Sequence, residues 1–161
     1  MQLKYYDIVH VTCEQDNAFF NSIGFKRVFM LKEDNKRFAY QKDIAKLCES
    51  VKQGCGMIAI RDFSIDRKLI AQMQGKEAML LIPISEITSC AGFSASRLMY
   101  KARMLIRYAK SKRIKIIFCT LAQNKLQACS SIQIIEMAKM LGADKKMIDE
   151  SFVAMNEELG E

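Results

Sequence analysis

Residues 77–84, EAMLLIPI, form the stretch that decides the fold class. The run is apolar without the alternation of a strand that has one face in water, so it predicts a strand covered on both faces. Shorter runs of the same kind occur at residues 56–60 (GMIAI) and 114–120 (IKIIFCT). Strands of this type belong to parallel sheets whose crossovers are helices. The sequence therefore predicts an α/β protein with a mostly parallel sheet.

Other segments complete a pattern in which strands and helices alternate. We expect further strands at residues 3–11 and 25–31, and a short one at 37–40 within an otherwise polar loop over 32–43. Helices are expected from Asp16 or Asn17 to the Gly24 stop, over 42–53, after a Ser64 N-cap with Ile65, Leu69, Ile70 and Met73 on its apolar face, and over 94–112, 130–141 and 144–158.

Successive βα units of this kind give right-handed crossovers and a single layered domain. A full eightfold (β/α) barrel usually needs about 200 residues or more, and this chain has 161. We therefore expect a single domain over residues 1–161. Its architecture is a degenerate or incomplete TIM-like (β/α) barrel, with an open α/β sheet as the alternative.

The charge of the chain is concentrated in one block. Residues 87–135 hold nine basic side chains and no acidic one, whereas residues 1–86 hold 13 basic and 11 acidic side chains. Residues 136–161 are acidic, and the formal net charge of the chain is +7. A concentrated positive block attracts polyanions. A solvated helix face is the alternative interpretation, but it does not explain why acids are missing.

The expected helix at 94–112 separates into two faces at 3.6 residues per turn. Leu98, Ala102, Leu105, Ile106 and Ala109 form one apolar stripe that should face the sheet. The basic side chains lie away from that stripe and continue past the helix end: Arg97, Lys101, Arg103, Arg107, Lys110, Lys112, Arg113 and Lys115.

Helix electrostatics explain only part of this charge. Cations in the last turn stabilise a helix against its own dipole by about 0.3–1 kcal/mol each, which suits Lys110, Lys112 and Arg113. Arg97 and Lys101 lie nearer the amino end, where a cation is mildly unfavourable. A phosphate backbone is the simplest partner that would explain them, and arginine suits bidentate phosphate contacts.

Other features exclude several classes of protein. No apolar run approaches the roughly 20 residues of a membrane span, and the amino terminus lacks the apolar core of a signal peptide, so we expect a cytoplasmic protein. The six cysteines form no CxxC pair, and His10 is the single histidine. We expect free, mostly buried thiols, no metal ligands and no cofactor in the protein.

Several segments together resemble a known family. They are RDFSIDRKLIAQM (61–73), AMLLIPIS (78–85), GFSASRLMYKARMLIRYAKSKRIKIIFCT (92–120) and LAQNKLQACSSIQIIEMAKMLGADKKMIDES (121–151), with YDIVHV (6–11) near the amino terminus. This order is similar to ribonuclease P protein component three, the thirty-kilodalton archaeal and eukaryotic subunit with a TIM-barrel-like fold. The chain resembles a short, divergent member.

The resemblance implies a role without catalytic residues in the protein. Such a subunit supports the catalytic domain of the ribonuclease P RNA, which holds the magnesium and matures the 5′ end of precursor tRNA. It implies a small α/β protein subunit as partner, including a heterotetramer of the two, and only indirect contact with precursor tRNA. Arg61, Arg97, Lys101 and Arg103 match basic positions of the family, and Lys125 is the cation nearest to Gln127, where the family has arginine.

Two rival functions remain open from the sequence. DIVH (7–10) faintly resembles the metal-binding motif of a metal-dependent phosphoesterase, but such sites need several histidines. Asp7 and His10 are better explained as a buried polar pair or a strand-end contact. The second rival is a protein-interaction module that uses the 11 methionines and the apolar face of the last helix, namely Ile148, Phe152, Met155 and Leu159. Packing of that face on the sheet is the simpler interpretation.

Overall fold

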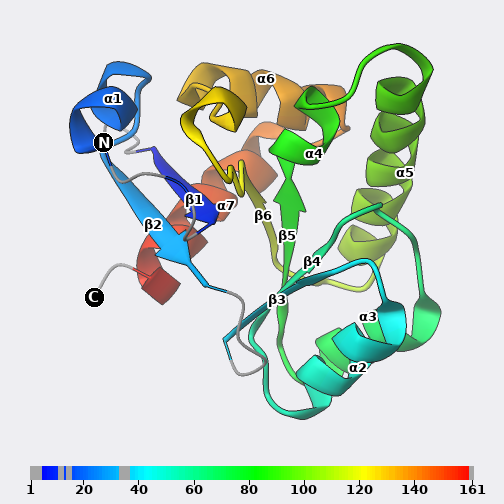
Figure 1. Ribbon diagram of the computed structural model, residues 1–161. Helices are drawn as coiled ribbons and strands as arrows, with labels where there is room; N and C mark the ends of the chain where they lie inside the picture. The colour runs from blue at the N-terminus through cyan, green and yellow to red at the C-terminus, as the bar shows by residue number, and fades with distance from the viewer. Residues whose placement is uncertain (1–4, 11–12, 14–15, 33–36, 160–161) are drawn as a thin grey trace.

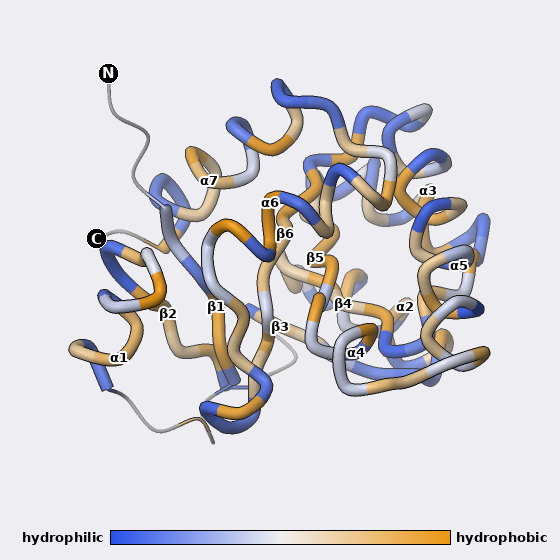
Figure 2. Tube along the Cα trace, turned by 90° about the horizontal axis from the view of Figure 1, so that it is seen from above, coloured by the Kyte–Doolittle hydropathy of each residue, from blue (hydrophilic) through white to orange (hydrophobic). Residues whose placement is uncertain are grey.

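Four buried strands form a parallel sheet in the computed structural model, which describes residues 5–10, 13, 16–32 and 37–159. Their order in space follows the sequence: β3 (Phe38–Gln41), β4 (Met57–Ile60), β5 (Met79–Pro83) and β6 (Ile116–Cys119). Every residue of β4, β5 and β6 is buried, as the apolar runs predict. Seen from above, apolar positions concentrate along these strands, and hydrophilic positions lie along the outer turns of the helices (Figure 2).

Helices connect these strands, as parallel neighbours require. The crossovers are α2 (Ile44–Lys52), α3 (Arg67–Gly75), and the pair α4 (Ile84–Thr88) and α5 (Gly92–Ser111). Asp43 and Asp66 cap α2 and α3 by accepting hydrogen bonds from backbone N–H groups of the first turn. The long helix α5 stands at the outer edge of the molecule (Figure 1).

An amino-terminal pair of strands forms a two-stranded unit of its own and lies beside the four-stranded sheet. Strands β1 (Tyr6–His10) and β2 (Arg27–Leu31) are parallel and are joined through α1 (Asn17–Ser22). The N–H of Leu121 donates to the carbonyl of Ile8 (2.8 Å), and the N–H of His10 donates to the carbonyl of Ala122 (3.0 Å). Strand β1 therefore lies beside the segment that follows β6, and the strands run in the order β2, β1, β6, β5, β4, β3.

The ring of strands is open between β2 and β3. These strands do not pair within the described part of the chain, and only residues 32–37 connect them. A parallel crossover needs a dozen or more residues, so a link of this length cannot make β2 and β3 parallel neighbours. The expectation of an incomplete (β/α) barrel with a mostly parallel sheet is confirmed.

A buried carboxylate joins the two parts of the sheet. Asp7 in β1 is fully buried, and its Oδ1 accepts from the N–H groups of Ile8 and Thr120, both at 2.8 Å. The hydroxyl of Thr120, which follows β6, donates to Oδ2 at 2.5 Å. Asp7 thus makes a buried polar contact, as expected, but its hydrogen bonds come from Thr120 and Ile8, whereas the sequence suggested a pair with His10.

The carboxyl-terminal helices cover the junction of β1 and β6. After η1 (Lys125–Gln127) the chain forms α6 (Ser131–Met140) and α7 (Lys145–Leu159). Helix α7 packs against both β1 and β6, and the Ser151 hydroxyl accepts a hydrogen bond from the N–H of Phe118 at 2.8 Å. The apolar face formed by Ile148, Phe152, Met155 and Leu159 is buried there, as the simpler interpretation predicted.

Most expected elements are present, with three corrections. The cap of α3 is Asp66 rather than Ser64, because Ser64 donates its hydroxyl to Asp62 (2.7 Å) outside the helix. Ile65 precedes α3 and is exposed instead of lining its apolar face. The expected strand over 77–84 ends at Pro83, where the unexpected helix α4 begins. Residues 3–4 and 11 of the first expected strand, and 33–36 of the loop, lie outside the described residues.

The buried carboxyl of Asp7 predicts a pH dependence of stability. Burial raises the pKa of Asp7 from 3.8 to about 7. Between about pH 4 and pH 7 the folded protein keeps a proton that the unfolded chain has released, so the free energy of unfolding falls as pH rises, by on the order of 4 kcal/mol. We expect the melting temperature to fall across this window in the wild type and to stay nearly level in Asp7→Asn.

The variant Asp7→Asn keeps the shape of the side chain and an oxygen for the two N–H donors. The pKa values of three other carboxyl groups are lowered, those of Asp16, Asp62 and Asp144. These groups make the free energy of unfolding rise with pH, but they do so at more acidic pH and equally in the wild type and in Asp7→Asn. Equal slopes in calorimetry of the two proteins would contradict the prediction.

Candidate nucleic-acid interface

Helix α5 presents the predicted apolar stripe to the core. Ala102, Leu105, Ile106 and Ala109 are buried, and Leu98 is partly buried against them. The helix has 20 residues and is therefore about 30 Å long. Its remaining faces are available for the cations that the sequence places on it.

The face opposite the core carries both exposed apolar side chains and arginines. Phe93, Arg97, Tyr100, Met104 and Arg107 are spaced at i, i+4, i+7, i+11 and i+14, which places them in one row along the helix. We call these five residues the outer row. Phe93 is 82 % exposed and Tyr100 65 % exposed. Exposed apolar side chains that lie together on one face of a helix often mark a binding surface.

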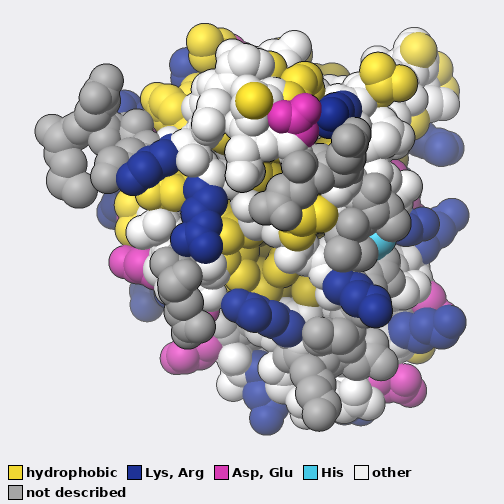
Figure 3. Space-filling view, turned by 60° about the vertical axis from the view of Figure 1, so that its left-hand side comes forward, with side chains coloured by type: hydrophobic (Ala, Val, Ile, Leu, Met, Phe, Trp, Pro, Cys, Tyr) yellow, Lys and Arg dark blue, Asp and Glu magenta, His cyan; other side chains and the backbone are white. Residues whose placement is uncertain are grey.

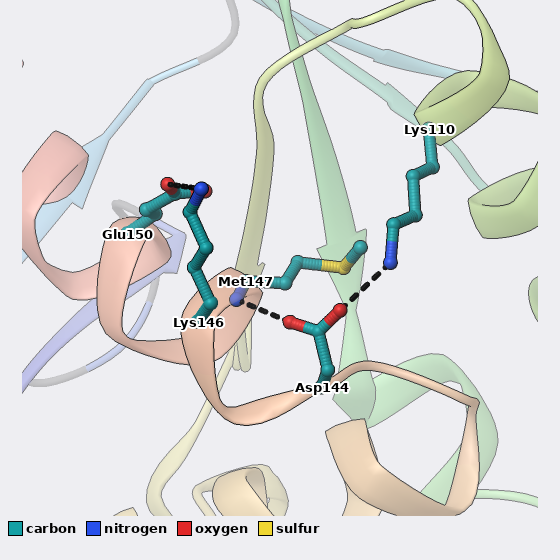
Figure 4. Close-up of polar contacts among 5 residues, drawn as sticks. All are labelled: Lys110, Asp144, Lys146, Met147 and Glu150. Carbon is teal, nitrogen blue, oxygen red and sulfur yellow. Dashed lines mark hydrogen bonds and ion pairs between the residues drawn. The ribbon is translucent and has the colours of Figure 1, made fainter.

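Three cations beside the outer row have partners inside the protein. Lys101 Nζ lies 3.6 Å from a carboxylate oxygen of Asp62, and Arg103 Nε donates to the carbonyl of Met140 at 2.8 Å. Lys110 Nζ donates to Asp144 at 2.8 Å, and Asp144 in turn caps α7 by accepting from the N–H of Met147 (Figure 4). The hydrogen bond from Lys110 lowers the pKa of the Asp144 carboxyl.

These contacts correct one expectation from the sequence. Lys101 was expected to need a partner outside the protein, but Asp62 in the β4–α3 loop provides one within it. Arg103 and Lys110 fix α5 to the end of α6 and the start of α7. The three side chains therefore have structural roles, and whether they also contact RNA stays a prediction.

The two arginines of the outer row differ from their neighbours. Arg97 and Arg107 are exposed and make no hydrogen bond or ion pair with any other residue that the structure describes. Their positive charges therefore do not hold any described part of the protein in place. They are the side chains of α5 best suited to hold an external anion.

More cations lie where α5 ends. Lys112, Arg113 and Lys115 are exposed, and Lys112 Nζ lies 5.8 Å from the ring centre of Tyr108. Arg113 has a φ of +58°, in the left-handed region. Its N–H bonds the carbonyl of Lys110, and that of Ile114 bonds the carbonyl of Ala109, which is the helix ending that usually places glycine at this position.

The two remaining candidate residues lie at the carboxyl ends of the strands. Arg61 follows β4 directly, and its guanidinium carbon lies 4.5 Å from the ring centre of Tyr40. Lys125 forms an ion pair with Asp16 at 2.8 Å, so it fixes η1 to the start of α1. Neither belongs to the outer row.

A small cavity of about 180 Å³ lies at the same carboxyl edge, where (β/α) barrels place catalytic residues. The Tyr40 hydroxyl donates to the carboxylate of Glu86, and burial together with this bond raises the pKa of Tyr40.

Among the described residues, no group of three or more His, Cys, Asp or Glu could hold a metal ion. The six cysteines, all within the described residues, form no disulfide; five are buried and Cys90 is half-buried. The arrangement supplies no specific support for the phosphoesterase alternative.

The side of the molecule that carries β1 and β2 has a mixed surface. Lys and Arg side chains are scattered there among Asp and Glu around an apolar area (Figure 3). Unlike α5, this face does not separate the two signs of charge. No helix among the described residues is long and apolar enough to cross a membrane.

Comparisons with known proteins identify the fold. No family model matches the chain, and no curated protein matches it significantly. A chain of the cryo-EM structure of archaeal ribonuclease P with mature tRNA is similar to it, with a TM-score of 0.69 and 11 % sequence identity. The match covers 96 % of this chain and 80 % of that chain. The two chains share a fold.

The left-handed backbone of Arg113 predicts that this residue lowers the stability of the fold while its side chain adds a positive charge. A residue with a side chain costs about 1–2 kcal/mol in the left-handed region, and glycine avoids most of this cost. After the greater flexibility of glycine in the unfolded chain is subtracted, Arg113→Gly should stabilise the protein by roughly 0.5–1 kcal/mol. Chemical denaturation would measure this, with Lys112→Gly as the matched control that should destabilise. A loss of stability in Arg113→Gly would contradict the prediction.

Proposed function

We propose that this protein is an RNA-binding subunit of ribonuclease P that supports the catalytic RNA in 5′ maturation of precursor tRNA and supplies no catalytic group itself. The observation that carries the proposal is the pair Arg97 and Arg107, exposed without internal partners on the outer row of α5. The shared fold with a chain of an archaeal ribonuclease P structure supports it.

The distribution of cations supports RNA as the ligand. Of the nine cations in the acid-free segment, Lys101, Arg103, Lys110 and Lys125 have partners within the protein. The other five are exposed and lie along the outer row or past its end: Arg97, Arg107, Lys112, Arg113 and Lys115. Arg97 and Arg107 are ten residues apart, about 15 Å along the helix, and the other three cations follow its end. Open cations spread over this distance suit a phosphate backbone better than a small anion.

The same proposal names the partners. We expect the catalytic domain of ribonuclease P RNA to hold the magnesium ions, and precursor tRNA to be contacted only through the assembled particle. A small α/β protein subunit is expected to bind this chain, with a heterotetramer as the assembly, and the particle is expected in the cytoplasm.

Matched pairs of substitutions test the interface. Arg97→Gln with Arg107→Gln removes two open cations, whereas Lys101→Gln with Lys139→Gln removes two cations that form ion pairs with Asp62 and Glu136 and lie outside the outer row. Each phosphate contact contributes about −0.7 to −0.9 to the slope of log affinity against log salt, so the first variant should reduce the slope by about 1.4–1.8. Filter binding to ribonuclease P RNA over a series of salt concentrations measures this slope for each variant.

The lysine variant is the control because it removes the same charge at cations that have partners within the protein. It also leaves the carboxylates of Asp62 and Glu136 unpaired, which makes any loss of binding larger. A reduction of the slope as large as that of the arginine variant would mean that net charge alone governs binding.

Purification of the tagged full-length chain from its source cells tests the role itself. We expect a large structured RNA to co-purify, together with cleavage of the 5′ leader of precursor tRNA. Because the RNA performs the hydrolysis, nuclease treatment of the purified fraction should abolish cleavage, and magnesium should be required. Leader cleavage that survives nuclease treatment, or purification without any structured RNA, would contradict the proposal.

A further inference from the structure

A groove runs beside the outer row of α5. It lies between α5 and the turn that joins α6 to α7, and its volume is about 460 Å³. Its lining is formed by Tyr100, Arg103, Met104, Ile106, Arg107, Lys110, Leu141 and Gly142. The volume lies within the range of about 300–1,000 Å³ that is typical of small-molecule sites. The groove is therefore large enough for one nucleotide.

The groove combines an exposed ring with cations. Tyr100 is 65 % exposed, and Arg103, Arg107 and Lys110 lie along the same lining, which includes no acidic side chain among the described residues. Asp144 is nearby, but its carboxylate is neutralised by Lys110. The chemistry of the lining thus suits a ligand with one negative charge and one flat apolar face.

Two of these cations are held in position by the fold. Arg103 uses Nε to bind the carbonyl of Met140, which leaves the N–H groups of its terminal nitrogens as further donors. Lys110 is held by Asp144, whereas Arg107 has no partner among the described residues. An arginine held by one of its nitrogens loses less freedom when it binds a phosphate with the others.

We propose that this groove binds one unpaired nucleotide of RNA, with the base stacked on the ring of Tyr100 and its phosphate held by Arg107 and Arg103. The proposal rests on the RNA-binding function above and adds which part of the RNA the site takes. Bases within an A-form duplex are stacked on one another, so only an unpaired base can offer its face to a side chain. A duplex would engage the cations alone.

The experiment compares two RNAs with equal numbers of phosphates, a stem-loop with an unpaired loop and a blunt-ended duplex. Tyr100→Ala in the full-length chain should weaken stem-loop binding about 5- to 150-fold and change duplex binding less than about twofold. Tyr100→Phe should bind both RNAs like the wild type, because it keeps the ring. Arg107→Gln should weaken binding of both.

Ile132→Ala is the matched control, since Ile132 is a 69 % exposed apolar residue in the first turn of α6 and is outside the groove lining. If Tyr100→Ala leaves the preference for the stem-loop unchanged while wild-type binding stays salt-dependent, the groove proposal is wrong and the RNA-binding function stands. If the wild type binds neither RNA with a salt dependence, both proposals fail.

Discussion

The hydrogen bonds of Asp7 to Thr120 hold together two parts of the sheet that are far apart in the sequence. Burying a carboxyl group is unfavourable unless its oxygens are bonded, and here both oxygens accept hydrogen bonds. Strand β1 is thereby fixed beside the end of β6, and α7 can pack across the junction. Backbone pairing at Leu121 and Ala122, the ion pair of Lys125 with Asp16 and the packing of α7 on β1 add to this contact. The incomplete barrel depends on this link, because β2 and β3 do not close it on the other side.

The side chains of helix α5 have three roles, and the role of each depends on the side of the helix on which it lies. The inner stripe packs on the sheet, the flanking cations bind the β4–α3 loop and the α6–α7 region, and the outer row is left for a partner. A count of positive charges does not reveal this division, because a lysine in an ion pair contributes little net field. The field of α5 in solution therefore comes mainly from Arg97, Arg103, Arg107 and the cations after its last turn, because the carbonyl that Arg103 binds does not neutralise its charge.

The sequence was sufficient for features that depend on local pattern. The apolar runs predicted the buried strands, and the 3.6-residue spacing predicted which face of α5 packs. The sequence was insufficient where two local signals compete, as at Ser64 and Asp66, which are both good N-caps. Helix α4 was missed because its buried residues continue the apolar run of β5. The contacts of Lys101 with Asp62 and of Arg103 with Met140 join residues 39 and 37 positions apart, so no local pattern predicts them.

The isolation of Arg97 and Arg107 from internal contacts has a consequence for how the protein can evolve. A substitution at either position removes no hydrogen bond or ion pair within the described structure, so selection can strengthen or weaken the hold on a ligand without loss of foldability. Arg103 and Lys110 lack this freedom, because each also fixes one helix to another. Among relatives of this chain, Arg97 and Arg107 should change when the ligand changes, whereas Arg103 and Lys110 should change together with the residues that they bind in α6 and α7.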